Sequence, residues 1–510
     1  MHYSTTHSNK QLTTTSTVEH PLFPYYFTPN IFLSHHRKDQ LHRIHRIKYT
    51  IVQTLYDSNV ITMRWEKDSM NVDSYFRDLV VGVNTKVPLF HGKCVTSINF
   101  DNAATTPPLH SVMREIEKFV PWYSSIHRGT GYKSLLSSDL YEEGRDVIKQ
   151  FVKADPTKDV LIYTKNSTEA LNLLSYVMAQ QDDKQVILST DMEHLANDLP
   201  WRDRFAIDYV CIDRYGMLSL KDLEMKLIKY SGKVKVVTVT GASNVTGYKN
   251  PIYKIAGLVH QHGAKIVVDG AQLAPHCPID MKPYDSIEHI DYLVFSAHKM
   301  YAPFGIGVLI GPKETFENQE PFCKGGGAVN LVSHQFVDWA TPPHKEEAGT
   351  PNVIGVVALL TAIKTLQHIG MNAIDEYEQE LIHYAIDGLR SIDGLTLYSF
   401  AQANENRLGI ISFNLAGIPH ELLAEILSYE AGISVRSGLF CAHPYVEKLL
   451  GLTDHDIKHY LQNPSTPFPG LARMSLGIYN NCMEIDILID LLTRIAKNKN
   501  VYKQKYKQER

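Results

Sequence analysis

The sequence predicts an α/β protein, with a large and mostly parallel β-sheet covered by helices on both faces and a smaller C-terminal α+β domain. Short apolar runs alternate with longer helical patterns, which is typical of a parallel sheet. The run Lys265–Val268 is apolar after its first residue, as expected of a strand buried on both faces. A chain of 510 residues can also bury a sizeable core and form two or more structural units.

Hydrophobic periodicity and turn residues predict the elements of the large domain in order. The predicted helices are Val72–Val83, Leu109–Val120, Asp139–Val152, Thr168–Ala179, Leu220–Tyr230 and Ile252–His262. The predicted strands are Ser97–Phe100, Asp159–Tyr163, Gln185–Leu188, Ile207–Ile212, Val234–Val239, Lys265–Val268 and Tyr292–Phe295. A polar loop, Ser124–Ser134, separates the second and third helices, and Gly263 ends the last helix.

A helix over Val353–Gln367 is predicted to link the large domain, residues 71–365, to the C-terminal domain, residues 366–510. The predicted strands of the C-terminal domain are Leu395–Tyr398, Gly409–Asn414, Ile433–Val435 and Ala472–Leu476, and its predicted helices are Glu421–Tyr429 and Glu484–Ala496. The triplet Asp454, His455 and Asp456 is interpreted as a solvated helix start rather than as a set of metal ligands.

Residues 1–70 differ in composition from the rest of the chain. Met1–Thr17 is rich in Ser and Thr, and Leu33–Lys48 is dense in His, Arg and Lys. The segment also carries acidic and aromatic residues, so it is a poor match to a targeting peptide. We interpret residues 1–70 as an extension that is disordered or not native to the working protein, with Met63 and Met70 as alternative starts of translation.

The composition excludes several classes of partner. A hydrophobic content of 44%, a charged content of 21% and a formal net charge of -4 do not favour nucleic acid or an anionic membrane as partners. No apolar run approaches the roughly 20 residues of a membrane-spanning helix.

The six cysteines are scattered without a CxxC pair, so we expect reduced thiols, a cytoplasmic location and no metal site.

The chemistry is predicted first by an acid and a lysine at two strand ends. Asp269 ends the predicted strand Lys265–Val268, and Lys299 follows the strand Tyr292–Phe295 in a turn. Ligands of open α/β sheets bind at the carboxyl ends of the strands. A pyridoxal phosphate enzyme needs this pair, because the lysine forms the Schiff base and the carboxylate keeps the pyridine nitrogen protonated.

Two further segments meet other needs of that cofactor. Asn166, Ser167 and Thr168 precede a predicted helix, whose N-terminus can bind a phosphate and can equally be a plain Ser/Thr cap. His194 follows the strand Gln185–Leu188 and offers a ring to stack on the pyridine. The pair Gly305 and Gly307 is interpreted as close strand packing rather than as a dinucleotide-binding loop.

The chain resembles the class V aminotransferase family of fold-type I pyridoxal phosphate enzymes, and within it the group II cysteine desulfurases, or selenocysteine lyase-like proteins. The matching motifs, in order, are NFDNAATT, IHRG, NSTEALN, MEHLAN with LPW, SNVTG, VVDGAQ, FSAHK with YAPFGIG, GGG, EEAGTPN, VRSGLFCAHP and ARMSLGIYN. They run from about residue 97 to residue 480. The resemblance implies a seven-stranded sheet in the large domain and a homodimer.

The resemblance implies a role for each matching position. Those assigned to the cofactor are Lys299 as the Schiff-base lysine, Asp269 as the pyridinium partner, His194 as the stacking ring, Gln272 on the phenolic oxygen, Asn244 beside it, and Ser167, Thr168, Ser296, His298 and Thr350 on the phosphate, with Thr350 reaching into a second subunit. Those assigned to the substrate are Arg473 and Asn244 on its carboxylate, with Arg436, His127 and Arg128.

Cys441 distinguishes the desulfurases within the family. There, the cysteine at this position attacks the substrate sulfur and leaves alanine and an enzyme persulfide, so Lys299, Cys441 and His194 are the implied catalytic residues. The Gly-containing loop RSGLFCAHP favours an exposed and reactive thiol, whose thiolate form Arg436 would favour. The expected substrate is L-cysteine, and the expected partner is a protein that accepts the sulfur.

Two alternatives remain open at this point. One is another class V enzyme, such as a selenocysteine or C–S lyase, an epimerase or an aminotransferase, acting on another amino acid. The other is a catalytically silent relative that serves as a scaffold. Leu439 and Phe440 stand where the family often has histidine before the cysteine, and Asn166 replaces the phosphate-loop glycine, which leaves the substrate and the sulfur acceptor open.

Overall fold

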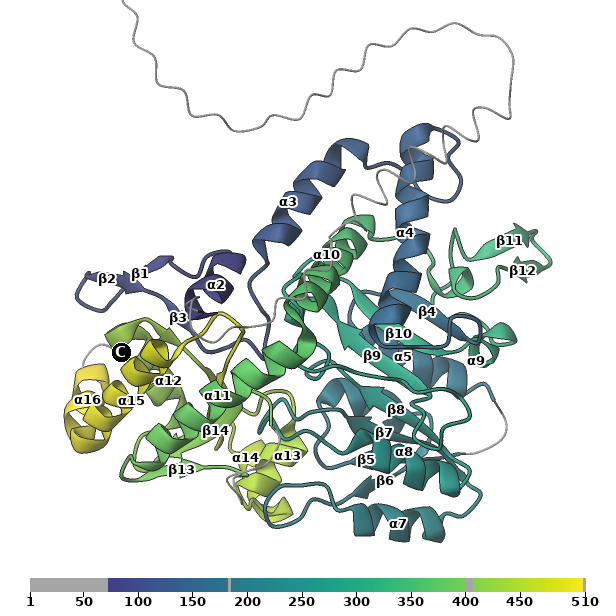
Figure 1. Cartoon of the computed structure of the whole chain (residues 1–510). Coiled ribbons are helices and arrows are strands. Elements are labelled where there is room, and N and C mark those ends of the chain that lie inside the picture. Colours follow the sequence, from purple (N-terminus) through teal and green to yellow (C-terminus); the bar gives the residue numbers. More distant parts are fainter. Residues whose placement is uncertain (1–71, 182–184, 400–406, 508–510) are drawn as a thin grey trace, which may run out of the picture. The chain divides into compact units, whose positions relative to one another are not determined.

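The computed structural model describes residues 72–181, 185–399 and 407–507 of the chain (Figure 1). The description below concerns the unit Glu66–Arg510, one of the two units into which the chain divides. The extension predicted over residues 1–70, with the alternative starts at Met63 and Met70, lies outside the described residues and stays a prediction.

A seven-stranded sheet forms the centre of the large half of this unit (Figure 1). Its strands stand in the order β4-β10-β9-β8-β7-β5-β6. Their bounds are β4 Asp159–Thr164, β5 Val186–Thr190, β6 Ala206–Val210, β7 Val234–Thr240, β8 Lys265–Asp269, β9 Tyr292–Ser296 and β10 Gly307–Pro312. Only the two pairs made by β10, with β4 and β9, are antiparallel. The mostly parallel seven-stranded sheet is therefore confirmed.

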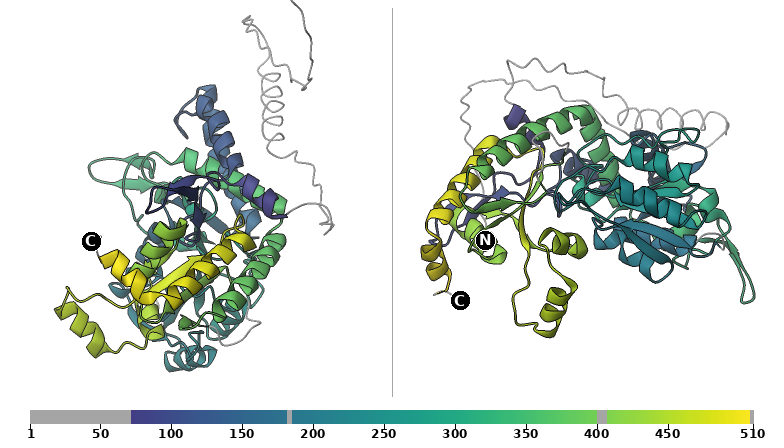
Figure 2. Two further views of the ribbon diagram at one scale, coloured as in Figure 1. Left: turned by 90° about the vertical axis from the view of Figure 1, so that its left-hand side faces the viewer. Right: turned by 90° about the horizontal axis from the view of Figure 1, so that it is seen from below.

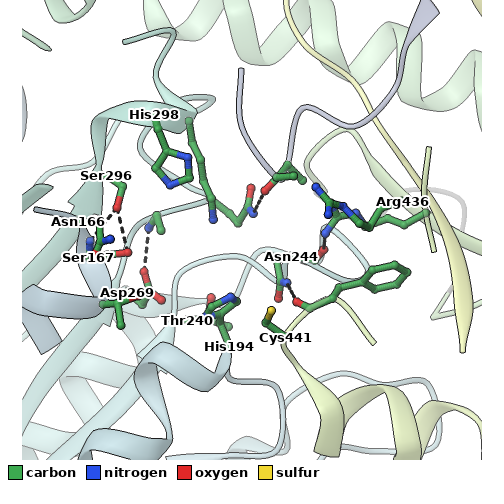
Figure 3. Close-up of a pocket in the computed structure, with 18 residues that line it drawn as sticks. Asn166, Ser167, His194, Thr240, Asn244, Asp269, Ser296, His298, Arg436 and Cys441 are labelled. Carbon is green, nitrogen blue, oxygen red and sulfur yellow. Dashed lines mark hydrogen bonds between the residues drawn. The ribbon is translucent and has the colours of Figure 1, made fainter. Parts of the chain in front are cut away.

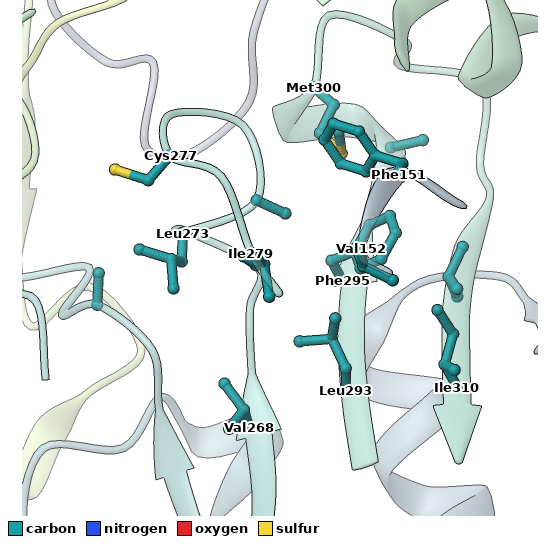
Figure 4. Packing of buried hydrophobic residues seen from close by; sticks show 14 of the residues in the cluster. Phe151, Val152, Val268, Leu273, Cys277, Ile279, Leu293, Phe295, Met300 and Ile310 are labelled. Carbon is teal, nitrogen blue, oxygen red and sulfur yellow. The ribbon is translucent and has the colours of Figure 1, made fainter. Parts of the chain in front are cut away.

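Helices cover both faces of this sheet, which explains why its central strands are apolar throughout. Successive strand residues point to opposite faces, so that Leu161 and Ile162 of β4 belong to different apolar clusters. One face carries α5 Ser167–Met178, α6 Leu199–Arg202 and α9 Glu314–Glu317; the other carries α3 His110–Phe119, α4 Tyr132–Phe151, α7 Leu220–Lys229, α8 Ile252–Gln261 and α10 Val353–Ile369. Figure 4 shows Val268, Leu293 and Ile310 from three neighbouring strands, in the apolar cluster on the face covered by α3, α4, α7, α8 and α10.

The C-terminal half is built on a four-stranded antiparallel sheet in the order β13-β14-β17-β16. Its strands are β13 Leu395–Leu397, β14 Ile410–Leu415, β16 Arg436–Gly438 and β17 Leu471–Ser475. The helices α11 Met371–Arg390, α12 His420–Ala431 and α15 Cys482–Lys497 share one apolar cluster with this sheet. The second domain thus has the expected α+β character.

Shorter elements complete the described residues. The strands are β1 Lys86–Pro88, β2 Cys94–Thr96, β3 Ile98–Asn99, β11 Val329–Val332, β12 Val337–Trp339 and β15 Ile433–Ser434, and the helices are α2 Val72–Leu79, α13 His443–Leu449, α14 Asp454–Gln462 and α16 Lys499–Lys507, with 3-10 turns at Val120–Trp122, Leu195–Asn197, Ala297–Lys299 and His344–Glu346. Strand β3 pairs in parallel with β15, and β11 and β12 form a hairpin that projects from the large half (Figure 2). The solvated helix start predicted at Asp454 is confirmed, because Thr453 and Asp456 form a reciprocal cap on α14.

Some predicted bounds were wrong for physical reasons. Helix α4 begins at Tyr132, seven residues before the predicted start at Asp139, because the serines that suggested a loop form hydrogen bonds within and beside the helix. The Ser138 hydroxyl donates to the Ser134 carbonyl at 2.8 Å, and the Ser134 hydroxyl donates to the Ser125 carbonyl at 2.6 Å. Helix α2 ends at Leu79 rather than Val83, since Val80 bridges to Leu109.

Helix α11 has no counterpart among the predicted elements. It follows α10 after a turn at Gly370, whose φ is 96°, and the two helices are bent by 75°. Among the described residues no single helix is long and apolar enough to cross a membrane, and this bent pair alone has the combined length and apolar composition of a span. The boundary expected between residues 365 and 366 falls inside α10, and the division into 71–365 and 366–510 stays a prediction.

Candidate functional site

A cavity of about 310 Å³ lies at the carboxyl ends of the parallel strands, where the C-terminal half meets the large sheet. It is lined by Ala103, Ala104, Asn166, Ser167, Thr168, His194, Thr240, Asn244, Asp269, Ala271, Gln272, Ser296, His298, Lys299, Arg436, Phe440, Cys441 and Arg473. Figure 3 shows that these side chains come from both halves of the unit and point into one space. Twelve of the fifteen residues predicted for the site therefore lie together.

Lys299 and Asp269 share the cavity because β8 and β9 are parallel neighbours that end at the same edge of the sheet. Burial lowers the pKa of Lys299 to about 8, although the charge of Asp269 opposes this shift. Burial also raises the pKa of Asp269. The N–H of Ala271 donates to its carboxylate at 2.9 Å and partly opposes this rise. A basic group placed beside Asp269 would be held in its protonated form, since it would stabilise the buried carboxylate.

An anion cradle lies at the N-terminus of α5. The backbone N–H of Ser167 donates to the Ser296 hydroxyl at 2.7 Å, and that hydroxyl donates to the Ser167 hydroxyl at 3.0 Å. Thr168 and His298 line the cavity beside them, and Asn166 caps the helix by accepting from the N–H of Glu169 at 3.0 Å. Hydroxyls and N–H groups at the start of a helix suit a phosphate.

The glycines that follow Lys299 allow close strand packing beside this cradle, as predicted for Gly305 and Gly307. A Cβ added at Gly307 would lie 2.5 Å from the Cα of Asn166, so β10 can approach the start of α5 only because it has glycine there. Gly305 has a φ of 68°, which a side chain would strain.

His194 presents a neutral ring to the cavity. Burial, together with the charges of Lys299 and Arg473, lowers its pKa to about 4. Its Nδ1 accepts from the N–H of Ala196 at 3.0 Å, which fixes the ring orientation. A neutral, oriented imidazole is suited to stacking on a flat ligand.

Gln272 offers an unused acceptor. Its Nε2 donates to the Ala103 carbonyl at 2.8 Å, whereas its buried Oε1 has no partner. A buried acceptor without a partner is unfavourable unless a ligand donor reaches it. With the amine, the buried carboxylate, the neutral ring and the anion cradle, this group makes a donor and acceptor set that fits pyridoxal phosphate.

The opposite end of the cavity carries positive charge. The Arg473 side chain is 3% exposed, and its Nη1 donates to the Asn244 carbonyl at 2.8 Å. Burial lowers the pKa of Arg473 to about 10, so the guanidinium stays charged near neutral pH. Its Nε is buried without a partner, and Arg436 lines the same end. This end suits a carboxylate.

Cys441 is exposed and lies in a loop held by the large half of the unit. Its carbonyl accepts from the N–H of Leu195 at 2.7 Å, and the Phe440 carbonyl accepts from Nδ2 of Asn244 at 2.7 Å (Figure 3). Phe440 and Cys441 have φ values of 52° and 54°, in the left-handed region that non-glycine residues rarely adopt. Two hydrogen bonds from other elements therefore hold the backbone at Cys441 in a strained conformation beside the cavity.

Three predicted residues do not line this cavity. Thr350 is exposed and lines a separate cavity of about 290 Å³ with Glu346 and Cys323. His127 and Arg128 are exposed in the loop before α4, where Nε2 of His127 lies 2.8 Å from Oε1 of Glu142. A second histidine, His344, brings a ligand atom within 4.8 Å of these two groups.

Asp101, Thr240 and Phe440 are residues of the site that the sequence analysis missed. Thr240 and Phe440 line the cavity. Asp101 does not line it but forms ion pairs with Arg436 and Arg473, which do. The sequence could have marked Asp101 as a site residue, because it directly follows a predicted strand within the motif NFDNAATT. No local pattern marks Phe440, which reaches the cavity only through the turn of its loop.

Comparisons with known proteins agree with this site. Residues 98–488 match the family model described as aminotransferase class-V. A probable cysteine desulfurase of Halalkalibacterium halodurans is 34% identical over 385 residues, which cover 74% of this chain and 91% of that protein. A second one, from Synechocystis sp., is 36% identical over 406 residues, 78% of this chain and 90% of the relative.

Solved structures give the same result. The apo structure of a cysteine desulfurase from Thermococcus onnurineus has a TM-score of 0.73 at 28% identity and covers 84% of this chain and 99% of its own. The cysteine desulfurase CsdA of Escherichia coli, in an S-sulfonic acid form, has a TM-score of 0.69 at 26% identity and covers 83% and 98%. The fold and the family expected from the sequence are thus confirmed.

Proposed function

The chain belongs to the class-V aminotransferase family, and from this premise we propose that it is a pyridoxal phosphate-dependent cysteine desulfurase. It converts L-cysteine into L-alanine and leaves the sulfur on Cys441. The observation that supports this most directly is one cavity that holds a buried amine, a buried carboxylate, a guanidinium and an exposed thiol.

Each part of the cavity has a role in holding the cofactor. Lys299 would bind it covalently, Asp269 would bind its ring nitrogen, and His194 would cover its ring. The cradle at α5, with Ser167, Thr168, Ser296 and His298, would hold the phosphate, and Gln272 and Asn244 would lie beside the ring. When bound, pyridoxal phosphate supplies an electron-accepting ring that stabilises negative charge at the substrate Cα.

The substrate is oriented from the other end. Arg473 and Asn244 bind its α-carboxylate, with Arg436 beside them. Nζ of Lys299, with a pKa of about 8, can both take the proton from the substrate Cα and return one near neutral pH. The carboxylate contacts determine which bond at Cα faces this amine.

Cys441 then receives the sulfur. Its thiolate attacks the substrate sulfur, an S–S bond forms as the C–S bond breaks, and the bonding electrons with a proton remain on the carbon that becomes the methyl group of alanine. The net reaction turns one enzyme thiol and L-cysteine into an enzyme persulfide and L-alanine, so no external oxidant is needed. The exposure of Cys441 would let an acceptor reach the persulfide.

The proposal is tested by incubating the purified protein with L-cysteine and measuring alanine and sulfide. Cys441→Ala should lower alanine formation by at least about 10³-fold, because removing a catalytic nucleophile lowers kcat by several orders of magnitude, while the absorbance of the bound cofactor persists. Lys299→Ala should lose both activity and that absorbance. The control, Cys94→Ala, removes another exposed thiol on β2 and should change neither.

The same experiment separates the alternatives. Unchanged alanine formation by Cys441→Ala would exclude a desulfurase, and a panel of amino acids would then distinguish a selenocysteine or C–S lyase, an epimerase and an aminotransferase. A pure protein that is colourless after addition of pyridoxal phosphate would favour the catalytically silent scaffold.

We further propose a homodimer in which Thr350 contacts the phosphate in the site of the second subunit. Thr350 is exposed and absent from the cavity of its own chain, which supports this role. A buried ion pair fixes its loop: Nη1 of Arg145 donates to Oε1 of Glu347 at 2.7 Å, and the Tyr141 hydroxyl donates to Oε2 at 2.8 Å. The hairpin β11–β12 also exposes apolar side chains, among them Leu331 and Phe336.

His127 and Arg128 fit the same proposal. Both are exposed and outside the cavity of their own chain, so we propose that they contact substrate from the second subunit.

The described cysteines are free thiols, which supports a cytoplasmic location. A persulfide on an exposed loop supports a thiol-bearing protein as the sulfur acceptor.

A further inference from the structure

Asp101 lies directly behind the two arginines of the cavity and is paired with both. Its Oδ1 lies 3.1 Å from Nη2 of Arg473, and its Oδ2 lies 2.8 Å from Nη2 of Arg436. Nε of Arg436 also donates to Oδ1 at 3.3 Å. One carboxylate thus uses both oxygens to join two guanidinium groups.

The two arginines need such a bridge because they stand opposite each other on neighbouring antiparallel strands. Arg436 of β16 and Arg473 of β17 are register partners, and like charges at facing positions repel. Solvent can screen this repulsion only from the side of Arg436, because the Arg473 side chain is 3% exposed and the Arg436 side chain is 47% exposed. Without a shared counter-charge, the Arg436 side chain is free to turn away into solvent.

Asp101 itself is held in place by the backbone. It forms a parallel bridge with Ser475, the last residue of β17, and its N–H donates to Oδ1 of Asn99 at 3.0 Å. Its carboxylate therefore has a fixed position relative to the strand that carries Arg473. Asp101 does not line the cavity, so it can act on a ligand only through the arginines.

A ligand acceptor is indicated by the donors that remain. Arg473 uses Nη1 on the Asn244 carbonyl and Nη2 on Asp101, while its buried Nε has no partner. The Phe440 ring lies 4.8 Å from the guanidinium carbon and covers it. With two arginines and one aspartate, this end of the cavity keeps one net positive charge, which matches one carboxylate.

We propose that Asp101 is a positioning residue that holds Arg436 and Arg473 together and so sets the affinity for the α-carboxylate of the amino-acid substrate. The inference rests on the proposed function only in taking an amino acid as the ligand of this end. It holds for any amino acid that the class-V site accepts.

The test compares ligands with and without a carboxylate in the holoenzyme. L-Alanine, the expected product, and cysteamine, which lacks the carboxylate, are titrated while the absorbance of the bound cofactor is recorded. Asp101→Asn should raise the Kd of L-alanine about tenfold, because the charge that aligns both guanidinium groups is lost. The Kd of cysteamine should stay within about twofold of the wild-type value.

Turnover of L-cysteine provides a second readout. Asp101→Asn should raise KM about tenfold and change kcat by less than about threefold, since Lys299 and Cys441 are untouched. The matched control is Asp280→Asn, which removes an aspartate paired with Lys153 on the surface and should leave both Kd values unchanged. Asp101→Ser is a second variant, in which water can replace the carboxylate, and it should show the same rise.

The outcomes decide the inference. An unchanged or lower Kd for L-alanine in Asp101→Asn would overturn it, and so would an equal rise for cysteamine. Failure of both Asp101 variants to fold with bound cofactor would assign the residue to folding and would also overturn it. Absence of alanine formation from L-cysteine by the wild-type enzyme would instead count against the proposed function, because the comparison of Kd values does not depend on that reaction.

Discussion

Burial determines the protonation states of two histidines and one lysine on the cavity wall. It lowers the pKa values of His194 and His298 to about 4, so both rings are neutral at physiological pH. It lowers the pKa of Lys299 to about 8, so a useful fraction of this amine is neutral there. The sequence offers only residue types at these positions, and their chemistry comes from the desolvation around them.

The first prediction concerns Lys299. Only its neutral amine can attack the aldehyde of pyridoxal phosphate, so the rate at which apoenzyme takes up the cofactor should rise with pH and reach half of its maximum at about pH 8. Stopped-flow absorbance between pH 6.5 and 10 measures this rate. A midpoint near 10.5, the ordinary value for lysine, would show that the amine is not desolvated.

At the scale of single elements, the start of α5 links stability to cofactor binding. Asn166 accepts from the N–H of Glu169 and fixes the first turn of the helix, where Ser167 and Thr168 line the cavity. The family resemblance implies glycine at this position, and asparagine is a stronger N-cap than glycine. The departure noted in the sequence therefore preserves the helix start.

The second prediction measures the effect of this cap on stability and on cofactor binding. Asn166→Ala should lower the free energy of unfolding by about 1 kcal/mol and weaken pyridoxal phosphate binding about fivefold, because the cap and the geometry of the first turn are lost together. Urea denaturation and titration of the apoenzyme measure the two quantities.

Its matched control is Ser219→Ala, which removes the cap of α7 far from the cavity. Ser219 accepts from the N–H of Asp222 at 3.2 Å, so a similar loss of stability is expected, with unchanged cofactor affinity. Equal losses of affinity in both variants would contradict a local role for Asn166.

Elements also show where local patterns mislead. The serine-rich loop predicted up to Ser134 ends at residue 131, because Ser134 and Ser138 bond within and beside the helix. The three-residue strand β16 was not predicted at all, since so short a run has no periodicity. It exists because β17 pairs with it and thereby brings Arg436 beside Arg473.

At the scale of the whole molecule, the third prediction follows from the proposed dimer. If Thr350 serves the site of the second subunit, Lys299→Ala and Thr350→Asp should each abolish activity as separate homodimers. Mixed dimers would place both defects in one site and leave the other intact. Refolding an equal mixture should therefore restore about a quarter of the wild-type activity, as random pairing of two subunits requires.

Light scattering on the purified protein provides the control, since a dimer mass is required before mixing. No recovery in the mixture, despite mixed dimers detected by differently tagged subunits, would contradict the exchange of Thr350 between sites.

By itself, the sequence determined the alternation of strands and helices and the placement of Asp269, His194 and Lys299 at strand ends. These follow from local patterns, because a buried parallel strand must be apolar and its end must turn into the ligand crevice. Tertiary structure alone decided the charge states in the cavity, the strained loop of Cys441 and the bridge made by Asp101. Asp101 stands 335 and 372 residues from its two arginine partners, and contacts over such separations arise only when distant strands pair and exclude water.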